Sequence, residues 1–168
     1  ANAQADMADG YLHSFDMLGE AARTGRDAAR YFASYANAIA AIGAAARHDD
    51  CHDNPGISVK LSALHPRYET VNAARVAREL GPRLIELAAM ARAVNIPLAV
   101  DAEEADRLDL SLALIEAALA EPRLASWDGF GVVVQAYSRR APAVLDWLGA
   151  TAARNRRRSD LRRSTSVK

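Results

Sequence analysis

Four polar residues in this 168-residue chain each follow an apolar run, and they recur at intervals of about 40 residues, roughly the length of one βα unit. Glu20 follows FDML, Lys60 follows ISV, Asp101 follows LAV and Gln135 follows VVV. Charged groups beside buried valines are costly unless they pair with one another or bind a ligand. Four such residues at regular spacing favour a binding or catalytic site, with structural ion pairing as the alternative.

The elements that must position these side chains alternate between strands and helices. Apolar segments rich in β-branched residues predict strands over residues 13–18, 57–64, 96–102 and 129–137. Amphipathic segments predict helices over residues 26–46, 70–94, 104–120 and 140–153. Gly81-Pro82 predicts a kink or a break in the second helix. The regular β-α order predicts an α/β fold with a parallel sheet, whose strands all end at one edge together with the four polar residues.

The kind of parallel fold is narrowed by motifs that the sequence lacks. Neither G-x-G-x-x-G nor a P-loop follows a predicted strand, which disfavours a doubly wound nucleotide-binding fold. A (β/α)8 TIM barrel is the better prediction, with the four βα units forming about its first half. We expect residues 1–153 to be this half-barrel. Residues 154–168 contain six Arg and one Lys against one Asp, and we expect them to be a separate basic tail.

The composition excludes several classes of protein. Hydrophobic residues make up 51% of the chain, charged residues 25%, and the formal net charge is zero, as in globular domains. No apolar run approaches the ~20 residues of a membrane span, and no signal peptide is recognised. The single Cys51 favours a cytoplasmic location. The basic tail could contact nucleic acid, but it has no aromatic residues, so we favour a solvated tail without a nucleic-acid partner.

Four longer segments resemble a known family. SFDMLGEAA (14–22), ISVKLSALHPRY (57–68), DAEEADRLDLSL (101–112) and VVVQAY (132–137) are similar, in order and spacing, to the proline dehydrogenase (PRODH) domain of bacterial bifunctional PutA proteins. The resemblance implies a (β/α)8 barrel that binds FAD at its C-terminal opening and oxidises L-proline to pyrroline-5-carboxylate by hydride transfer to the flavin. It also implies electron transfer to a membrane quinone, and therefore a cytoplasmic protein peripheral to the inner membrane.

The resemblance gives roles to the residues at the strand ends. Lys60 would pair with the substrate carboxylate, Asp101 would lie in the active site, and Glu20 would pair with an arginine of the last barrel helix. The residues expected along the flavin are Asp101, Ala102, Val133 and Gln135. The flavin would supply the redox chemistry, while these groups orient it and the substrate.

The sequence departs from the family after residue 153. The family continues there with a strand resembling RLVKGAYW, whereas this sequence reads RRSTSVK over 162–168. A truncated or frameshifted reading frame would explain the arginine run. The alternative function is therefore a catalytically inactive half-barrel that forms a homo-oligomer through its open sheet edges.

Other polar groups have structural interpretations. RHDDCHDNPG (47–56) could hold a metal ion, but it precedes a strand, so we predict a polar loop and no metal site. His65 lies at the same end as the candidate site, and a structural role in the loop is favoured over a catalytic one.

Two further groups are expected to serve the fold. Glu103, Glu104 and Asp106 are expected to favour the positive end of the following helix. Three aromatic residues at helical spacing are expected to pack in the core rather than against a cofactor: Tyr31, Phe32 and Tyr35.

Overall fold

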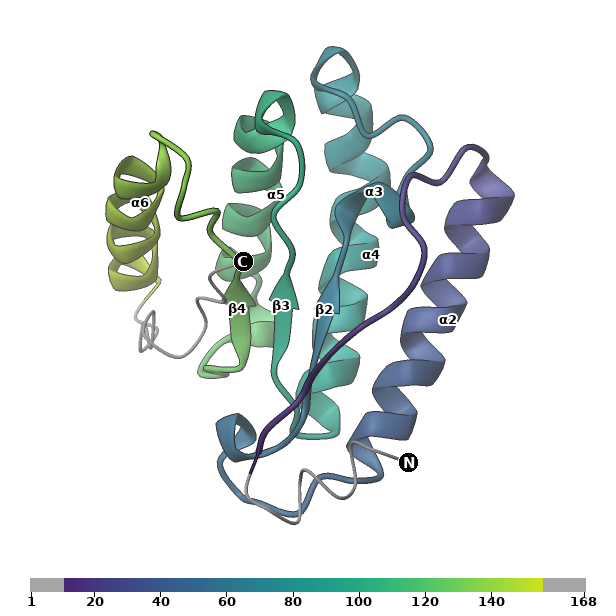
Figure 1. Cartoon of the computed structure of the whole chain (residues 1–168), viewed down its shortest axis with the longest axis vertical. Helices are drawn as coiled ribbons and strands as arrows, with labels where there is room; N and C mark the ends of the chain where they lie inside the picture. The colour runs from purple at the N-terminus through teal and green to yellow at the C-terminus, as the bar shows by residue number, and fades with distance from the viewer. Residues whose placement is uncertain (1–10, 156–168) are drawn as a thin grey trace.

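The computed structural model describes residues 11–155, in which four short strands alternate with helices (Figure 1). The strands are β1 (Ser14–Asp16), β2 (Gly56–Val59), β3 (Leu98–Val100) and β4 (Phe130–Val132). The helices are α2 (Gly25–Gly43), α3 (Leu61–Leu64), α4 (Ala73–Ala93), α5 (Leu108–Ala120) and α6 (Ala141–Arg154). Most of the predicted basic tail, residues 156–168, lies outside the described residues.

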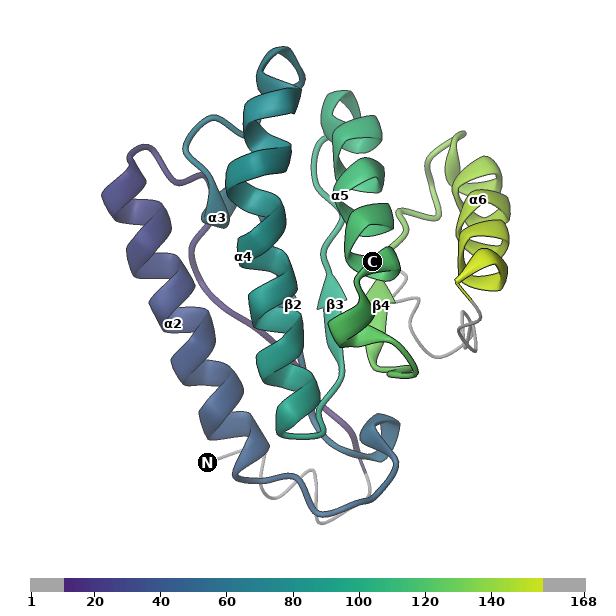
Figure 2. The same cartoon turned by 180° about the vertical axis from the view of Figure 1, so that it is seen from behind.

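All four strands are parallel and follow one another in chain order, β1-β2-β3-β4. Helices α2, α4, α5 and α6 pack side by side in the same order and lie on one face of the sheet, as Figures 1 and 2 show from opposite sides. In a doubly wound fold the helices would divide between both faces. Helices on one face of a sequentially ordered parallel sheet are the winding of a (β/α)8 barrel. The predicted fold class is confirmed.

Alternation along the strands decides which side chains face the helices. Ile57, Val59, Leu98 and Val100 are at most 1% exposed and belong to the core beneath the helices. The intervening Ser58 and Ala99 point to the uncovered face and are partly exposed. Because successive strand residues point to opposite faces, the polar residues that come directly after β2 and β3 continue on this uncovered face.

Helix α2 begins at a capping box. The Thr24 hydroxyl accepts a hydrogen bond from the Asp27 backbone, and the Asp27 carboxylate accepts one from the Thr24 backbone. Tyr35 on this helix is 1% exposed, and Tyr31 and Phe32 are partly buried against the same core. The prediction that these aromatic residues pack in the core is confirmed.

Helix α4 runs without a break through Pro82, so of the two alternatives predicted at Gly81-Pro82 the break is wrong, and the kink stays a prediction. The buried positions continue across the proline at helical spacing, as Val76, Leu80, Leu84 and Leu87. Pro82 itself is exposed. The carbonyl of Arg78 that it leaves without an intrahelical donor therefore lies on the solvent side, where water can replace the lost bond.

The predicted strands were too long at their C-terminal ends. The strand predicted over 57–64 ends at Val59, and residues 61–64 form the single helical turn α3. Likewise β4 ends at Val132, although the Val133 amide still donates to the Val100 carbonyl at 2.9 Å. The apolar residues beyond the end of β2 are buried in α3, which packs against α2 and α4, and composition alone does not distinguish such a turn from a strand. None of the described helices is long and apolar enough to cross a bilayer.

Candidate functional site

Lys60 lies at the centre of a charged cluster at the C-terminal edge of the sheet. Its Nζ is 2.7 Å from both carboxylate oxygens of Asp16, at the end of β1, and 3.0 Å from Oδ2 of Asp101, after β3. The Lys60 side chain is 13% exposed and that of Asp101 is 7% exposed, whereas Asp16 is 42% exposed. One cation therefore joins three neighbouring strands, and the more exposed carboxylate is on the solvent side.

The two carboxylates hold Lys60 in its charged form. Burial alone would lower the pKa of Lys60, but its hydrogen bonds to Asp16 and Asp101 and their charges outweigh burial and raise the pKa above its usual value. The Lys60 backbone is also fixed, because its N–H donates to the Tyr35 hydroxyl at 3.1 Å. A cation held rigidly in this way suits the binding of an anionic ligand that can compete with the exposed carboxylate.

Three of the four residues singled out in the sequence line one open pocket. Glu20, Lys60 and Gln135 lie on it together, and its volume is about 450 Å³. Asp101 reaches the same place through its ion pair with Lys60. Volumes of this order are typical of small-molecule sites. The structure thus brings the strand-end residues of all four βα units to one edge, as the alternation of strands and helices predicted.

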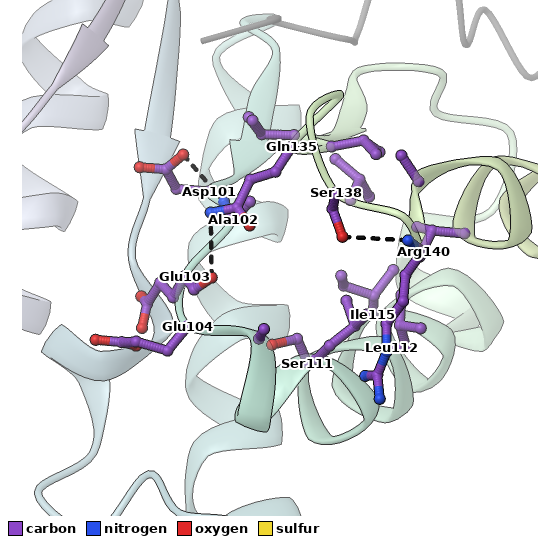
Figure 3. A pocket seen from close by; sticks show the side chains of 17 residues that line it. Asp101, Ala102, Glu103, Glu104, Ser111, Leu112, Ile115, Gln135, Ser138 and Arg140 are labelled. Atoms are coloured by element: carbon purple, nitrogen blue, oxygen red, sulfur yellow. Dashed lines mark hydrogen bonds between the residues drawn. The ribbon is translucent and has the colours of Figure 1, made fainter.

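The residues expected beside a flavin lie next to this cluster. Asp101, Ala102, Val133 and Gln135 line a smaller cavity of about 50 Å³ beyond the ends of β3 and β4, whose wall is completed by residues of α5 and α6, and Figure 3 shows it from close by. Ala102 and Gln135 also line the larger pocket. A cavity of about 50 Å³ is too small for a flavin ring, so a flavin would have to lie in the larger open pocket, where Ala102 offers a small side chain and Gln135 an amide that suits the polar ring edge.

Asp16 is a site residue that the sequence analysis missed. The predicted strand extended to residue 18, which made Glu20 look like the first polar residue after the strand. In the structure β1 ends at Asp16, and Asp16 is in register with Ser58, on the same face as Lys60. The available signal was an acidic residue inside a predicted strand, two residues before a Leu-Gly pair, and it was too weak to mark the strand end.

Glu103 was assigned to the helix terminus, and this prediction is wrong. Its Oε1 accepts a hydrogen bond at 3.0 Å from the backbone N–H of Ser62, 41 residues away. Burial raises the pKa of Glu103 despite the hydrogen bonds that it accepts from Ser62. Helix α5 begins only at Leu108, and its start has no side-chain cap. A partner that lies far away in the sequence gives no local signal.

The contacts of His65 indicate a structural role and do not require a catalytic one. It is 2% exposed, its Nδ1 accepts from the Arg67 backbone N–H at 3.0 Å, and its Nε2 lies 3.0 Å from Glu79 of α4. Because Nδ1 is an acceptor, the neutral ring carries its proton on Nε2 and donates it to Glu79. His65 therefore attaches the loop after β2 to α4.

The loop over 47–56 lies at the opposite, N-terminal end of the sheet. Possible ligand atoms of Asp50, Cys51 and His52 lie within 4.8 Å of one another. The Asp50 carboxylate accepts from the His52 backbone, as an N-cap of the short turn that follows. Burial raises the pKa of the Cys51 thiol, and the negative charges of nearby carboxylates raise it further. A raised pKa disfavours the thiolate that a metal ion would need. These contacts agree with a structural turn.

The sheet winding and the charged cluster at the strand C-termini define a chain of the (β/α)8-barrel class, with four βα units in residues 11–155. Within that class the chain belongs to the proline dehydrogenase family, whose model, described as "Proline dehydrogenase", matches residues 1–162. The family predicted from the sequence is confirmed.

Its relatives are longer proteins. The chain is 51% identical to the bifunctional protein PutA of Salmonella typhimurium over 162 residues, which cover 96% of this chain and 12% of that protein. It is 50% identical, over the same shares, to the bifunctional protein PutA of Escherichia coli. The chain thus spans about an eighth of the length of these curated relatives.

Solved structures show the same fold. A crystal structure of a variant of proline utilization A (PutA) from Bradyrhizobium japonicum superposes with a TM-score of 0.85 at 57% identity, over 87% of this chain and 15% of that one. A PutA structure from Bdellovibrio bacteriovorus superposes with a TM-score of 0.82 at 20% identity, which indicates the shared fold alone.

Proposed function

We propose that this chain supplies the first four βα units of an FAD-dependent proline dehydrogenase site, in which L-proline is oxidised to pyrroline-5-carboxylate. The observation that carries the proposal is the position of Lys60, a fixed cation at the strand C-termini of a family member, on the same pocket as Glu20 and Gln135. Bound FAD supplies the hydride acceptor for this oxidation, and a quinone would then take up the electrons.

The residues of this chain would bind and orient. Lys60 would pair with the proline carboxylate, which would replace the exposed Asp16 carboxylate, while the buried Asp101 keeps the ammonium group in place. Val133, Ala102 and the Gln135 amide would hold the flavin, the amide facing its polar edge. Pairing with a fixed cation orients the substrate carboxylate and reduces the entropy lost on reaching the reactive geometry.

Flavin absorbance tests this function directly. The purified chain is titrated with FAD, and L-proline is then added without oxygen. We expect saturable quenching of flavin fluorescence and loss of the visible flavin bands after proline, but not after the same amount of glycine. A Lys60→Met variant should keep FAD and lose most of the response to proline. Absence of saturable FAD binding, or an equal response to proline in the variant, would argue against the proposed roles.

A second candidate function is self-association of the half-barrel without catalysis. It is favoured by one observation: within the described sheet, β1 and β4 each pair with a single neighbouring strand, and the face opposite the helices has no layer over it. Unpaired strand edges recruit further strands. Sedimentation of the colourless chain as a dimer, with no FAD binding, would support this candidate over the first.

A further inference from the structure

Glu103 is a buried carboxylate that the proposed chemistry leaves unused. Its side chain is 9% exposed, and its Oε1 accepts the hydrogen bond from the Ser62 backbone. Its Oε2 is buried and accepts no hydrogen bond from the described residues, and the Arg107 guanidinium lies 4.0 Å away. A buried carboxylate with few hydrogen bonds disfavours the folded state, so a residue of this kind calls for a specific role.

Ser62, which donates to Glu103, also accepts two hydrogen bonds from the loop after β1. Ser62 is 6% exposed, and its Oγ accepts from the Ala21 backbone N–H at 3.1 Å. Its carbonyl oxygen accepts from the Ala22 backbone N–H at 2.9 Å. The loop that carries Glu20 is therefore bonded to the turn after β2 through one residue, and that residue is bonded to Glu103.

The loop after β1 needs such support because its backbone is strained. Ala21 has a φ of 52° and Gly19 a φ of 127°, so both neighbours of Glu20 adopt positive φ values. A side chain at Gly19 would bring its Cβ into overlap with the Tyr31 ring, so glycine is required there. Alanine in the left-handed region persists where surrounding contacts fix it, and at Ala21 those contacts come from Ser62.

The main chain of Glu103 contacts the fourth βα unit. Its carbonyl oxygen accepts from the Gln135 side-chain amide at 3.2 Å, as Figure 3 shows. Glu103 itself follows β3, Ser62 follows β2, and the Ser62 partners follow β1. Glu103 thus joins the loops after β2, β3 and β4 directly, and the loop after β1 through Ser62.

We propose that Glu103 is a positioning residue that, acting through Ser62, fixes the loop bearing Glu20 relative to Gln135. This inference deepens the proposed function, because it concerns the same pocket. It differs from a general role in stability, since the effect of removing the carboxylate should concentrate at Ala21 and Ala22 and at the cofactor, and not spread over the whole fold.

The test compares four variants of the full chain. Glu103→Ala removes the acceptor, Glu103→Gln keeps an oxygen acceptor without the charge, and Ser62→Ala removes only the hydroxyl. Glu116→Ala is the matched control, since Glu116 is 49% exposed on α5 and pairs with Arg154 at 2.9 Å. Amide hydrogen exchange is read residue by residue in ¹⁵N-labelled protein, and FAD affinity is measured by quenching of flavin fluorescence.

Loss of one such hydrogen bond corresponds to about a ten-fold change in a local equilibrium. We expect Glu103→Ala to speed exchange at Ala21 and Ala22 by about ten-fold more than in the centre of α4, and to weaken FAD binding by about ten-fold or more. Ser62→Ala should speed exchange at Ala21 by a similar factor. Glu103→Gln should stay within about three-fold of the unmodified chain in both measurements, as should the control.

Two results would overturn the inference. One is exchange that rises equally across α2, α4 and the loop in Glu103→Ala, which would mean general destabilisation. The other is a Glu103→Gln variant as impaired as Glu103→Ala, which would mean that the hydrogen bond is not what matters. If Glu103→Ala does not fold, unchanged exchange at Ala21 in Ser62→Ala would also overturn it. If the unmodified chain binds no FAD, the proposed function fails and the exchange data still decide the positioning claim.

Discussion

Replacing Lys60 with methionine removes the cation from between two carboxylates of unequal burial. Methionine keeps much of the volume of the side chain, so the change is mainly one of charge. The variant leaves Asp101, which is 7% exposed, without its buried partner, whereas Asp16, at 42% exposed, can still be solvated. The two ion pairs of one lysine should therefore contribute very differently to stability.

The distances give the size of the difference. At an effective dielectric constant of about 20, attraction across the 3.0 Å between Lys60 and Asp101 amounts to about 5 to 6 kcal/mol. Desolvation of both groups offsets part of this attraction, and breaking a buried pair by removing one partner costs about 3–5 kcal/mol. The pair with the exposed Asp16 is screened by water, and such pairs contribute about 0.2–1 kcal/mol.

Two double-mutant cycles measure these contributions. Urea unfolding of Lys60→Met, Asp101→Asn and the double variant gives one coupling energy, and the same cycle with Asp16→Asn gives the other. We expect a coupling of about 2 kcal/mol or more for Asp101 and below about 1 kcal/mol for Asp16. The exposed Glu116–Arg154 pair, at 2.9 Å, is the control and should also lie below about 1 kcal/mol. Equal couplings for the two aspartates would refute this reasoning.

Three further outcomes are expected. Because the pKa of Lys60 is raised in the folded state, its ion pairs stabilise the fold fully below the unfolded lysine pKa of about 10.4 and lose this effect as the pH rises further. The difference in unfolding free energy between the unmodified chain and Lys60→Met should therefore shrink above about pH 10. A constant difference up to about pH 12 would contradict this. Tyr35→Phe removes the acceptor of the Lys60 N–H and should lower the free energy of unfolding by about 1–2 kcal/mol in urea denaturation, whereas no loss would mean that the contact is dispensable. Pro82→Ala supplies the missing donor to the Arg78 carbonyl inside α4 and should raise the free energy of unfolding by about 1–3 kcal/mol, seen as a higher thermal midpoint. A lower midpoint would show that the helix depends on proline there.

The elements and their order could be predicted because they depend on local patterns. Stripes of buried residues such as Tyr35, Ile39 and Ile42 mark a helix from sequence alone, and the β-branched runs mark the strands. The convergence of Lys60 and Asp101 also followed, since parallel strands end at one edge and side chains alternate between faces. The broad position of the candidate site was therefore accessible before any coordinates.

The details that failed depend on contacts between distant residues. Asp16 became recognisable only when β1 was seen to end there, and strand ends are set by where pairing with the neighbour stops. Glu103 fits a helix start by composition, but its partner Ser62 lies in another βα unit. Continuity of α4 through Pro82 depends on which side of the helix faces water. Local patterns gave only weak signals for Asp16 and Pro82 and none for the partner of Glu103.

The central claim, that the strand-end residues of four βα units form one site for a flavin and proline, is tested most directly by NMR of the ¹⁵N-labelled chain during titration with FAD. The account predicts saturable shifts of the Lys60, Ala102, Val133 and Gln135 amides, with L-proline then shifting Lys60 further. Shifts confined to the N-terminal edge of the sheet, or no saturable shift at these four residues, would contradict it.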